Sequence, residues 1–207
     1  MKKLIENLIM KDYPQGHITQ WFGENPTLYN GLGLKGHNGI DIVAPYGTPI
    51  YAFKKGHVVN TEFQNGGYGG HIRIMDNDYE YIYAHLSKID VKNGWFVEEG
   101  QKIGEMGNTG FVVSGSTPFW KYNPYAGTHL HFGIRPYSQE GTPFMVHYPS
   151  GDERYLLLWE NGFKGSIDPK TFIEPNLETQ KEKQTKTILL TMVSVYNQLI
   201  ALIKGRR

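Results

Sequence analysis

Short apolar or alternating segments, separated by Gly, Pro and Asn, make up most of this 207-residue chain. They recur about every 8–12 residues, and none keeps a helical period for more than about three turns. Alternation with a period of two, interrupted by turn residues, predicts strands joined by tight turns. The clearest predicted strands lie at 40–43, 50–53, 57–59, 72–74, 79–84 and 129–134. The pattern therefore predicts a mainly β fold.

The last thirty residues follow a different pattern. Apolar side chains recur there at spacings of three and four in two adjacent rows, and Thr, Ser, Gln and Ala occupy the opposite face. This periodicity predicts a C-terminal amphipathic α-helix within 187–204. Its apolar positions are Ile188, Leu189, Met192, Val193, Val195, Tyr196, Leu199, Ile200, Leu202 and Ile203.

The predicted helix has three alternative roles. It can pack against a partner helix or the body of the protein, lie on a membrane surface, or span the membrane. The segment 187–203 is uncharged and has basic flanks, but seventeen residues is the low end for a span, and Asn197 and Gln198 lie inside it. We therefore favour helix-mediated packing or self-association, or contact with a membrane surface, through 187–204.

Composition changes near residue 176 and suggests the domain organisation. All 11 Pro and 24 of the 25 Gly precede residue 178. Segment 178–207 has six basic side chains against two glutamates, a net charge of +4, so the rest of the chain carries −3. We expect an N-terminal lead-in at 1–15, a β domain at 16–175 and a basic helical tail at 176–207. The overall charge of +1 gives no reason to expect nucleic acid as a partner.

The chain contains no Cys, which excludes disulfide scaffolds, cysteine-ligated zinc and thiol nucleophiles. Any metal must be held by carboxylates and some of the eight His. The N-terminus begins basic like a secretory signal, but Glu6 and Asn7 interrupt the apolar run and no small-residue cleavage site follows. We found no secretory signal and expect the protein to be made in the cytoplasm.

Four polar residues have the types and spacing of a metal site. His129 and His131 are two residues apart in a predicted strand, so their side chains share one face. His37 and Asp41 are four residues apart across a glycine. Together with one histidine of the pair, they would supply two nitrogens and one oxygen, the ligand set of a catalytic zinc with an open position. The residues alone predict a zinc hydrolase.

Several sequence motifs, which include these four residues, resemble those of the lysostaphin/LytM-type zinc metallopeptidases, which cut peptide bonds in peptidoglycan. The resemblance runs from about 16 to 174, and its motifs stand in the family's order. They are ITQWFG (18–23), GHNGIDIVAPYGTPI (36–50), YIYAHL (81–86), GQKIGEMGNTG (100–110), GTHLHF (127–132) and IDPKTFI (167–173).

The resemblance implies a fold and an active site. The fold would be a twisted antiparallel β-sheet with long loops that form a groove. His37, Asp41 and His131 match the family's ligands for one catalytic Zn²⁺. His85 and His129 match two further active-site histidines, which would orient or deprotonate water and assist the leaving amine. The sequence leaves open which of the two is the general base.

The resemblance also implies a function. We expect a zinc-dependent endopeptidase that hydrolyses peptide bonds in the stem peptide or cross-bridge of bacterial peptidoglycan. The lack of a secretory signal suggests a phage lysin, released to or carried to the cell wall where it acts. The alternative is a non-catalytic wall-binding protein, or a phage structural or assembly protein, that uses the same groove.

Three features depart from the family pattern. Gly133 replaces a frequent acidic residue, and two insertions, at 111–126 and at about 138–165, are expected to build groove walls. The first insertion is rich in aromatic side chains, which either stack on substrate or anchor the loop. We expect it to supply substrate contacts from Trp120, Tyr122 and Tyr125.

Overall fold

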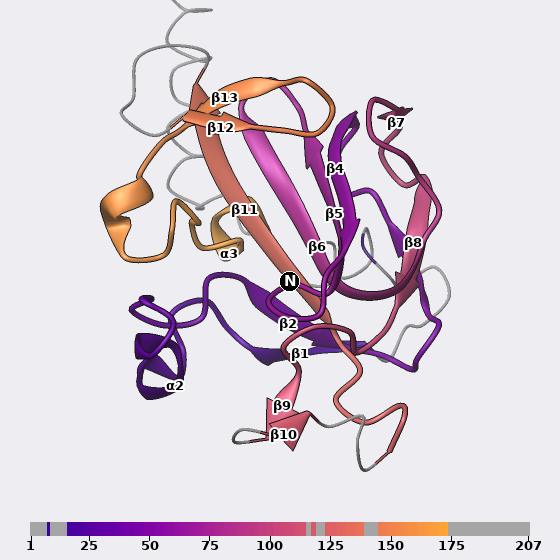
Figure 1. Ribbon diagram of the computed structural model, residues 1–207, viewed down its shortest axis with the longest axis vertical. Coiled ribbons are helices and arrows are strands. Elements are labelled where there is room, and N and C mark those ends of the chain that lie inside the picture. The colour runs from indigo at the N-terminus through magenta and orange to yellow at the C-terminus, as the bar shows by residue number, and fades with distance from the viewer. Residues whose placement is uncertain (1–7, 9–15, 115–116, 119–122, 139–144, 174–207) are drawn as a thin grey trace, which may run out of the picture. The chain divides into compact units, whose positions relative to one another are not determined.

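Antiparallel strands form the main sheet of the protein (Figure 1). The computed structural model describes residues 8, 16–114, 117–118, 123–138 and 145–173. The strands of the described part are β1 (His17–Gln20), β2 (Ile40–Val43), β3 (Pro49–Tyr51), β4 (Gly56–Phe63), β5 (Gly70–Met75), β6 (Tyr79–Ile89), β7 (Phe96–Val97), β8 (Lys102–Met106), β9 (Val113–Ser114), β10 (Thr117–Pro118), β11 (Leu130–Ser138), β12 (Met145–His147) and β13 (Glu153–Leu156).

Helices are few and short in the described part of the chain. They are α2 (Pro26–Asn30), the 3₁₀ helix η3 (Trp159–Asn161) and α3 (Lys170–Ile173). The chain divides into two compact units, Met1–Pro169 and Lys170–Arg207, and α3 is the described part of the second. No helix within the described ranges has the length and apolar character needed to cross a membrane. The predicted amphipathic helix at 187–204 lies outside the described residues.

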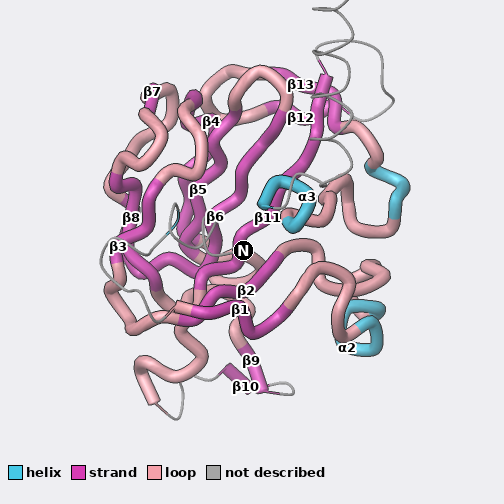
Figure 2. The backbone as a smooth tube through the Cα atoms, turned by 180° about the vertical axis from the view of Figure 1, so that it is seen from behind, coloured by secondary structure: helices cyan, strands magenta, loops and turns pink. Residues whose placement is uncertain are grey.

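The predicted mainly β, antiparallel fold is confirmed. Each of the six predicted strands overlaps an observed strand. The segment 40–43 matches β2 at both ends, whereas 50–53 shares only its first two residues with β3. The main sheet runs β1-β2-β11-β6-β5-β4-β7, and β8 joins β3 to β6 (Figure 2). β6 and β11, the two longest strands, lie side by side in the middle of this order in both views.

Aromatic side chains from β6, β11 and the turn after β3 form the centre of the core. Tyr83 and Phe132 are fully buried, and their ring centroids lie 5.3 Å apart. The Phe53 ring packs edge-on against Phe132 at 5.5 Å. The Tyr83 hydroxyl accepts a hydrogen bond from the Phe53 backbone N–H at 2.9 Å, so the one polar atom of this ring is satisfied inside the core.

The register of three central strands positions the site. β11 pairs with β2 on one side and β6 on the other, so His131 lies opposite both Asp41 and Ala84. His85 follows Ala84, and His129 precedes β11 and forms an isolated bridge with Gly107. Residues that are 90 positions apart in sequence therefore become neighbours through backbone pairing.

Replacing Tyr83 with phenylalanine should destabilise the protein without changing its shape. Tyr83→Phe leaves the buried Phe53 N–H without an acceptor, which costs about 1–3 kcal/mol of unfolding free energy. Urea denaturation of the variant measures this loss. Tyr46→Phe, which alters an exposed tyrosine, is the control and should change stability by less than about 0.5 kcal/mol. Equal stabilities of the two variants would contradict this account of the core.

Candidate active site

Three predicted ligands converge on one point beside the central strands. His37 Nε2 lies 2.9 Å from His131 Nδ1 and 3.0 Å from Asp41 Oδ1. His131 Nδ1 lies 3.1 Å from the same oxygen. The three donor atoms therefore form a nearly equilateral triangle, and all three residues are buried. The structure brings together the set that the motifs predicted.

The protonation states of these residues suit a cation. Burial raises the pKa of the Asp41 carboxyl, but hydrogen bonds with His131 and His37 outweigh it and hold the pKa well below its ordinary value. Burial also lowers the pKa of His131 to about 4. His37 Nδ1 lies 3.2 Å from the Trp21 carbonyl oxygen, which can accept a hydrogen bond from Nδ1–H, and in that tautomer Nε2 is free to bind a metal. An ionised carboxylate and neutral imidazoles are what a metal requires.

The geometry of the triangle fits zinc. Ligand atoms about 2.0–2.1 Å from a tetrahedral zinc are roughly 3.3 Å from one another, close to the three observed distances. Two imidazoles and a carboxylate that turn their lone pairs toward one point repel one another unless a proton or a metal ion lies between them, and a metal ion can engage all three at once. His37, Asp41 and His131 would therefore hold the ion, and their arrangement supports the prediction of zinc.

Gly39 is required for this approach of β2 and β11. A Cβ at this position would lie 2.5 Å from the Phe132 carbonyl oxygen and 2.7 Å from His131 Cε1. Backbone cannot yield at that distance, so any side chain would push the His131 ring away from Asp41. This glycine is therefore a steric necessity of the site.

Gly133, which stands where the family often has an acidic residue, affects the surroundings of His131. With Nδ1 turned toward the other ligands, the proton of a neutral His131 sits on Nε2. This atom is buried and has no hydrogen-bond partner among the described residues. A Cβ at Gly133 would lie 3.7 Å from it, so the glycine leaves empty the position from which a longer side chain could reach Nε2.

The two further histidines lie together beside the ligands. The ring centroids of His85 and His129 are 4.6 Å apart, and His129 Nε2 lies 3.7 Å from Asp41 Oδ2. Nδ1 of His85 lies 2.8 Å from the Thr109 carbonyl, and Nδ1 of His129 lies 2.7 Å from the Gly127 carbonyl. A carbonyl only accepts, so each Nδ1 is the donor in these contacts, and each Nε2 faces away from them toward substrate or water.

His85 has an unusual backbone conformation. Its φ is 63°, in the left-handed region, although it lies within β6 and is not glycine. A backbone hydrogen bond to the Tyr68 carbonyl at 2.8 Å holds it there. Burial, with the nearby imidazoles of His129 and His131, keeps the pKa of His85 well below its ordinary value. His85 is therefore neutral at neutral pH and able to accept a proton.

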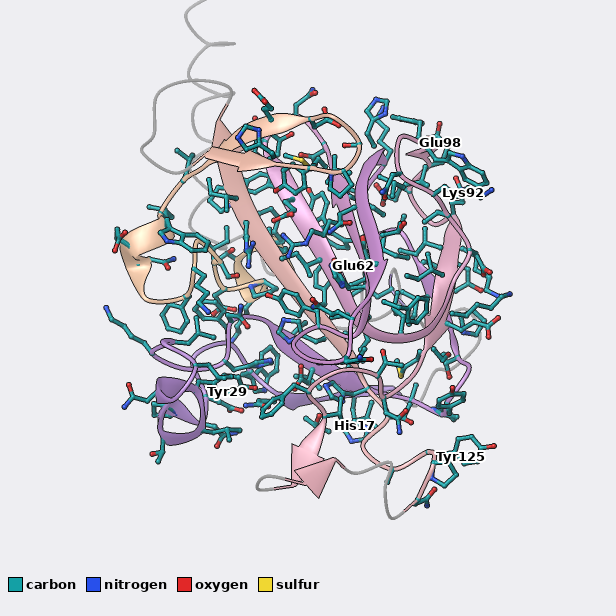
Figure 3. The ribbon with its side chains drawn as sticks, in the orientation of Figure 1. His17, Tyr29, Glu62, Lys92, Glu98 and Tyr125 are labelled. Atoms are coloured by element: carbon teal, nitrogen blue, oxygen red, sulfur yellow. The ribbon has the colours of Figure 1, made fainter. Side chains whose placement is uncertain are left out.

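An open groove leads to these residues. Its walls include described residues from both predicted insertions, namely Phe111, Val112 and Tyr125 from the first and Leu156, Trp159 and Lys164 from the second. The expectation that the insertions build groove walls is thus confirmed for their described parts. Figure 3 shows Tyr29 and Tyr125, which both line the groove, on either side of His17.

Only one of the three predicted substrate-contacting aromatics lies within the described residues. Tyr125 is 62% exposed and packs edge-on against Tyr46, with ring centroids 5.1 Å apart. It lines the groove with an accessible face, so its contact with substrate stays a prediction. Trp120 and Tyr122 lie outside the described residues.

Tyr68 is a candidate site residue that the sequence reasoning missed. Its ring packs on the His131 ring with centroids 5.4 Å apart. Its hydroxyl accepts hydrogen bonds from Asn38 Nδ2 at 3.0 Å and Arg135 Nη2 at 3.4 Å, so its own O–H remains a donor in the groove that it lines. The available signal was the sequence GGYGG at 66–70, a single aromatic framed by glycines.

A β fold with two histidines and one aspartate on the floor of an open groove defines a metallohydrolase-type site. The particular family is also shown. Residues 35–143, just over half of the chain, match the model of peptidase family M23, and the chain belongs to that family. The predicted recognition of a lysostaphin/LytM-type metallopeptidase is confirmed.

Named relatives agree with this family. Lysostaphin of Staphylococcus simulans is 34% identical over 124 residues, which cover 56% of this chain and 22% of lysostaphin. The peptidoglycan DD-endopeptidase ShyA of Vibrio cholerae is 41% identical over 100 residues, which cover 47% of this chain and 20% of ShyA. The chain thus spans about a fifth of the length of these curated relatives.

A solved structure agrees with the fold. The catalytic domain of lysostaphin from S. simulans aligns with a TM-score of 0.55 and 24% sequence identity. The alignment covers 84% of this chain and 98% of that domain. The similarity therefore extends over nearly all of the lysostaphin catalytic domain.

The positions of the chain's own residues are compatible with the predicted chemical roles, which stay a prediction. When held by His37, Asp41 and His131, zinc supplies Lewis acidity, which polarises a peptide carbonyl and acidifies water. His85 Nε2 can accept a proton, and the adjacent His129 can carry one to the departing amine. The Tyr68 O–H can donate to the negative charge that develops on the carbonyl oxygen.

Asp41→Asn should lower the affinity for zinc by at least about a hundredfold, because loss of an outer-shell contact alone costs 10–100-fold. The amide keeps the shape of the side chain but removes the charge that the two imidazoles surround. Competition with a chromophoric chelator measures the affinity. Asp78→Asn, which alters an exposed turn aspartate, is the matched control. Equal affinities of the two variants would exclude Asp41 as a ligand.

Proposed function

We propose that this chain is a zinc-dependent endopeptidase that hydrolyses peptide bonds in bacterial peptidoglycan. The observation that carries the proposal is the complete site, in which three converging ligands lie next to two histidines with available Nε2 atoms. The names of the relatives support the substrate, because they include a peptidoglycan DD-endopeptidase and the glycyl-glycine endopeptidase ALE-1 of Staphylococcus capitis. Both the stem peptide and the cross-bridge are therefore candidate targets.

The intact site argues against a non-catalytic scaffold. A protein that only binds the wall or assembles a particle needs neither a low-pKa carboxylate between two imidazoles nor a strained histidine beside it. The backbone conformation of His85 has a cost of order 1–3 kcal/mol, which a binding surface has no reason to carry. We therefore place catalysis above the scaffold alternative.

The cell wall is the place of action under this proposal. Release of the protein by a phage remains a prediction from the sequence, as do self-association and membrane-surface contact through 187–204. Deletion of 178–207 addresses these ideas. The tail has no role in membrane contact if the deletion leaves the distribution between membrane and soluble fractions unchanged. It has no role in self-association if the deletion leaves the oligomeric state unchanged.

Hydrolysis tests the proposal directly. The zinc-loaded protein should release new amino termini from purified peptidoglycan, and a chelator should abolish this release reversibly. His85→Ala and His129→Ala should each lower kcat by about 10²–10⁴-fold while the protein still binds one zinc, because neither residue is a ligand. Amine labelling of the digested wall and mass spectrometry of the fragments give the rates and the bond cut.

His57→Ala is the control for these two variants. His57 is exposed on β4, where its ring packs on Phe96 at 5.1 Å, and it does not line the groove. The control should keep the wild-type rate. Absence of new amino termini from walls of both cross-bridge chemistries, with zinc bound, would refute the proposed activity.

A further inference from the structure

The described walls of the groove carry an excess of positive charge. Three basic side chains with permanent charge, Arg73, Arg135 and Lys164, line it, and the one lining carboxylate is Asp41. A zinc ion at Asp41 would add to this excess. The protein as a whole is almost neutral, with a net charge of +1, so the imbalance belongs to the groove.

Two of these positive charges are buried around one carboxylate. Glu80 is fully buried, Arg73 Nη1 lies 3.1 Å from its Oε1, and Arg135 Nη1 lies 3.6 Å from its Oε2. The Tyr148 hydroxyl also donates to Oε1 at 2.9 Å. Among the described residues no second carboxylate joins this group, so two guanidinium groups share a single negative charge.

Part of the hydrogen-bonding capacity of the two guanidinium groups is unused or engaged only at long distances. Arg73 Nε is buried and has no partner in the described structure. Arg135 makes only long hydrogen bonds, 3.5 Å to Ser166 Oγ and 3.4 Å to Tyr68 Oη, although its side chain is 6% exposed. Buried guanidinium donors are normally satisfied, and carboxylates are the groups that match their planar geometry.

We propose that Arg135 and Arg73 form a carboxylate-binding subsite of the groove, so that the peptide substrate carries a free carboxylate near the bond that is cleaved. The inference rests on the proposed function and narrows its substrate. A neutral glycine bridge offers no carboxylate within its length, whereas a stem peptide with free α- or side-chain carboxylates does. Amidation of that carboxylate would then protect the wall.

Tyr68 sets the distance between this subsite and the metal ligands. Its ring packs on His131, and its hydroxyl accepts the hydrogen bond from Arg135. One tyrosine side chain therefore separates the two, a span of roughly two or three residues of extended peptide at ~3.3 Å each. The carboxylate should lie at that distance from the scissile amide.

Matched peptides test the subsite. The two peptides of a pair differ at one position, two or three residues from the scissile bond, where one has a free carboxylate and the other a carboxamide. One pair has this position on the N-terminal side of the scissile bond, and the other pair has it on the C-terminal side. A ketomethylene group replaces the scissile amide, so that binding is measured even if the protein cleaves nothing. Isothermal titration of the zinc-loaded full chain should show that, in one pair, the acid binds about ten- to a hundredfold more tightly than the amide.

Variants identify the residues responsible. Arg135→Gln should bring the ratio of acid to amide affinity close to one, whereas Lys92→Gln should keep the wild-type ratio. Lys92 is an exposed lysine that lies outside the groove (Figure 3), so its substitution removes the same charge elsewhere. If the carboxylate of the peptide bound to the zinc ion and not to the arginines, the preference for the acid would persist in Arg135→Gln, so this variant distinguishes the two binding modes. If this variant does not fold, Arg73→Gln replaces it.

Two results would overturn the inference. One is equal affinity of the wild type for acid and amide in both pairs, which would leave Arg73, Glu80 and Arg135 as a purely structural cluster. The other is an acid preference that persists in a folded Arg135→Gln protein. Failure to cleave peptidoglycan, by contrast, would refute the proposed function and leave the binding ratio standing.

Discussion

The close approach of β2 and β11 is the constraint on which the rest of the site depends. Pairing of these strands places Asp41 opposite His131, and the absence of a side chain at Gly39 lets the imidazole reach the carboxylate. Once this contact is made, His37 has a fixed place four residues before Asp41, with its ring oriented by the Trp21 carbonyl. The ligand triangle is thus a product of backbone register and needs little adjustment of side chains.

The neighbouring strand β6 adds His85 to the same geometry. β6 pairs with the other side of β11, and its local left-handed turn at His85 directs that ring toward His129. The loop between β4 and β5 then contributes the Tyr68 carbonyl, which holds the His85 N–H, and the Tyr68 ring, which covers His131. The predicted metal ligands, the two further histidines and the groove floor therefore share one small set of strand pairings.

The sequence predicted those parts of the molecule that depend on local sequence patterns. The six strands followed from alternation and turn residues, and the ligand set followed from the spacing of His129 and His131 and of His37 and Asp41. Tyr68 could not be found in this way, because its importance comes from contact with His131, 63 positions later, and nothing local marks it beyond flanking glycines. Glu80 could not be found either, because its pairing with Arg135 depends on the strand register that places the two residues opposite each other. The strain at His85 arises from tertiary contacts, so no propensity could reveal it.

The cluster of Arg73, Glu80 and Arg135 lies on β5, β6 and β11, whereas the ligand triangle lies on β11, β2 and the segment before β2. The two groups therefore share β11, and Tyr68 contacts both of them. Under the proposed subsite, Tyr68 would link the carboxylate of the substrate to the metal ligands. The basic character of the groove is invisible in the nearly neutral total charge, because the acidic residues that balance it lie elsewhere, as with the exposed Glu62 and Glu98.

The most direct test of the account is the location of zinc in crystals of the zinc-loaded protein, from anomalous diffraction at the zinc edge. The account predicts one fully occupied ion within about 2.0–2.2 Å of His37 Nε2, of an Asp41 carboxylate oxygen and of His131 Nδ1, with His85 and His129 outside the coordination sphere. An ion held instead by His85 or His129, or an anomalous peak away from β2 and β11, would contradict it.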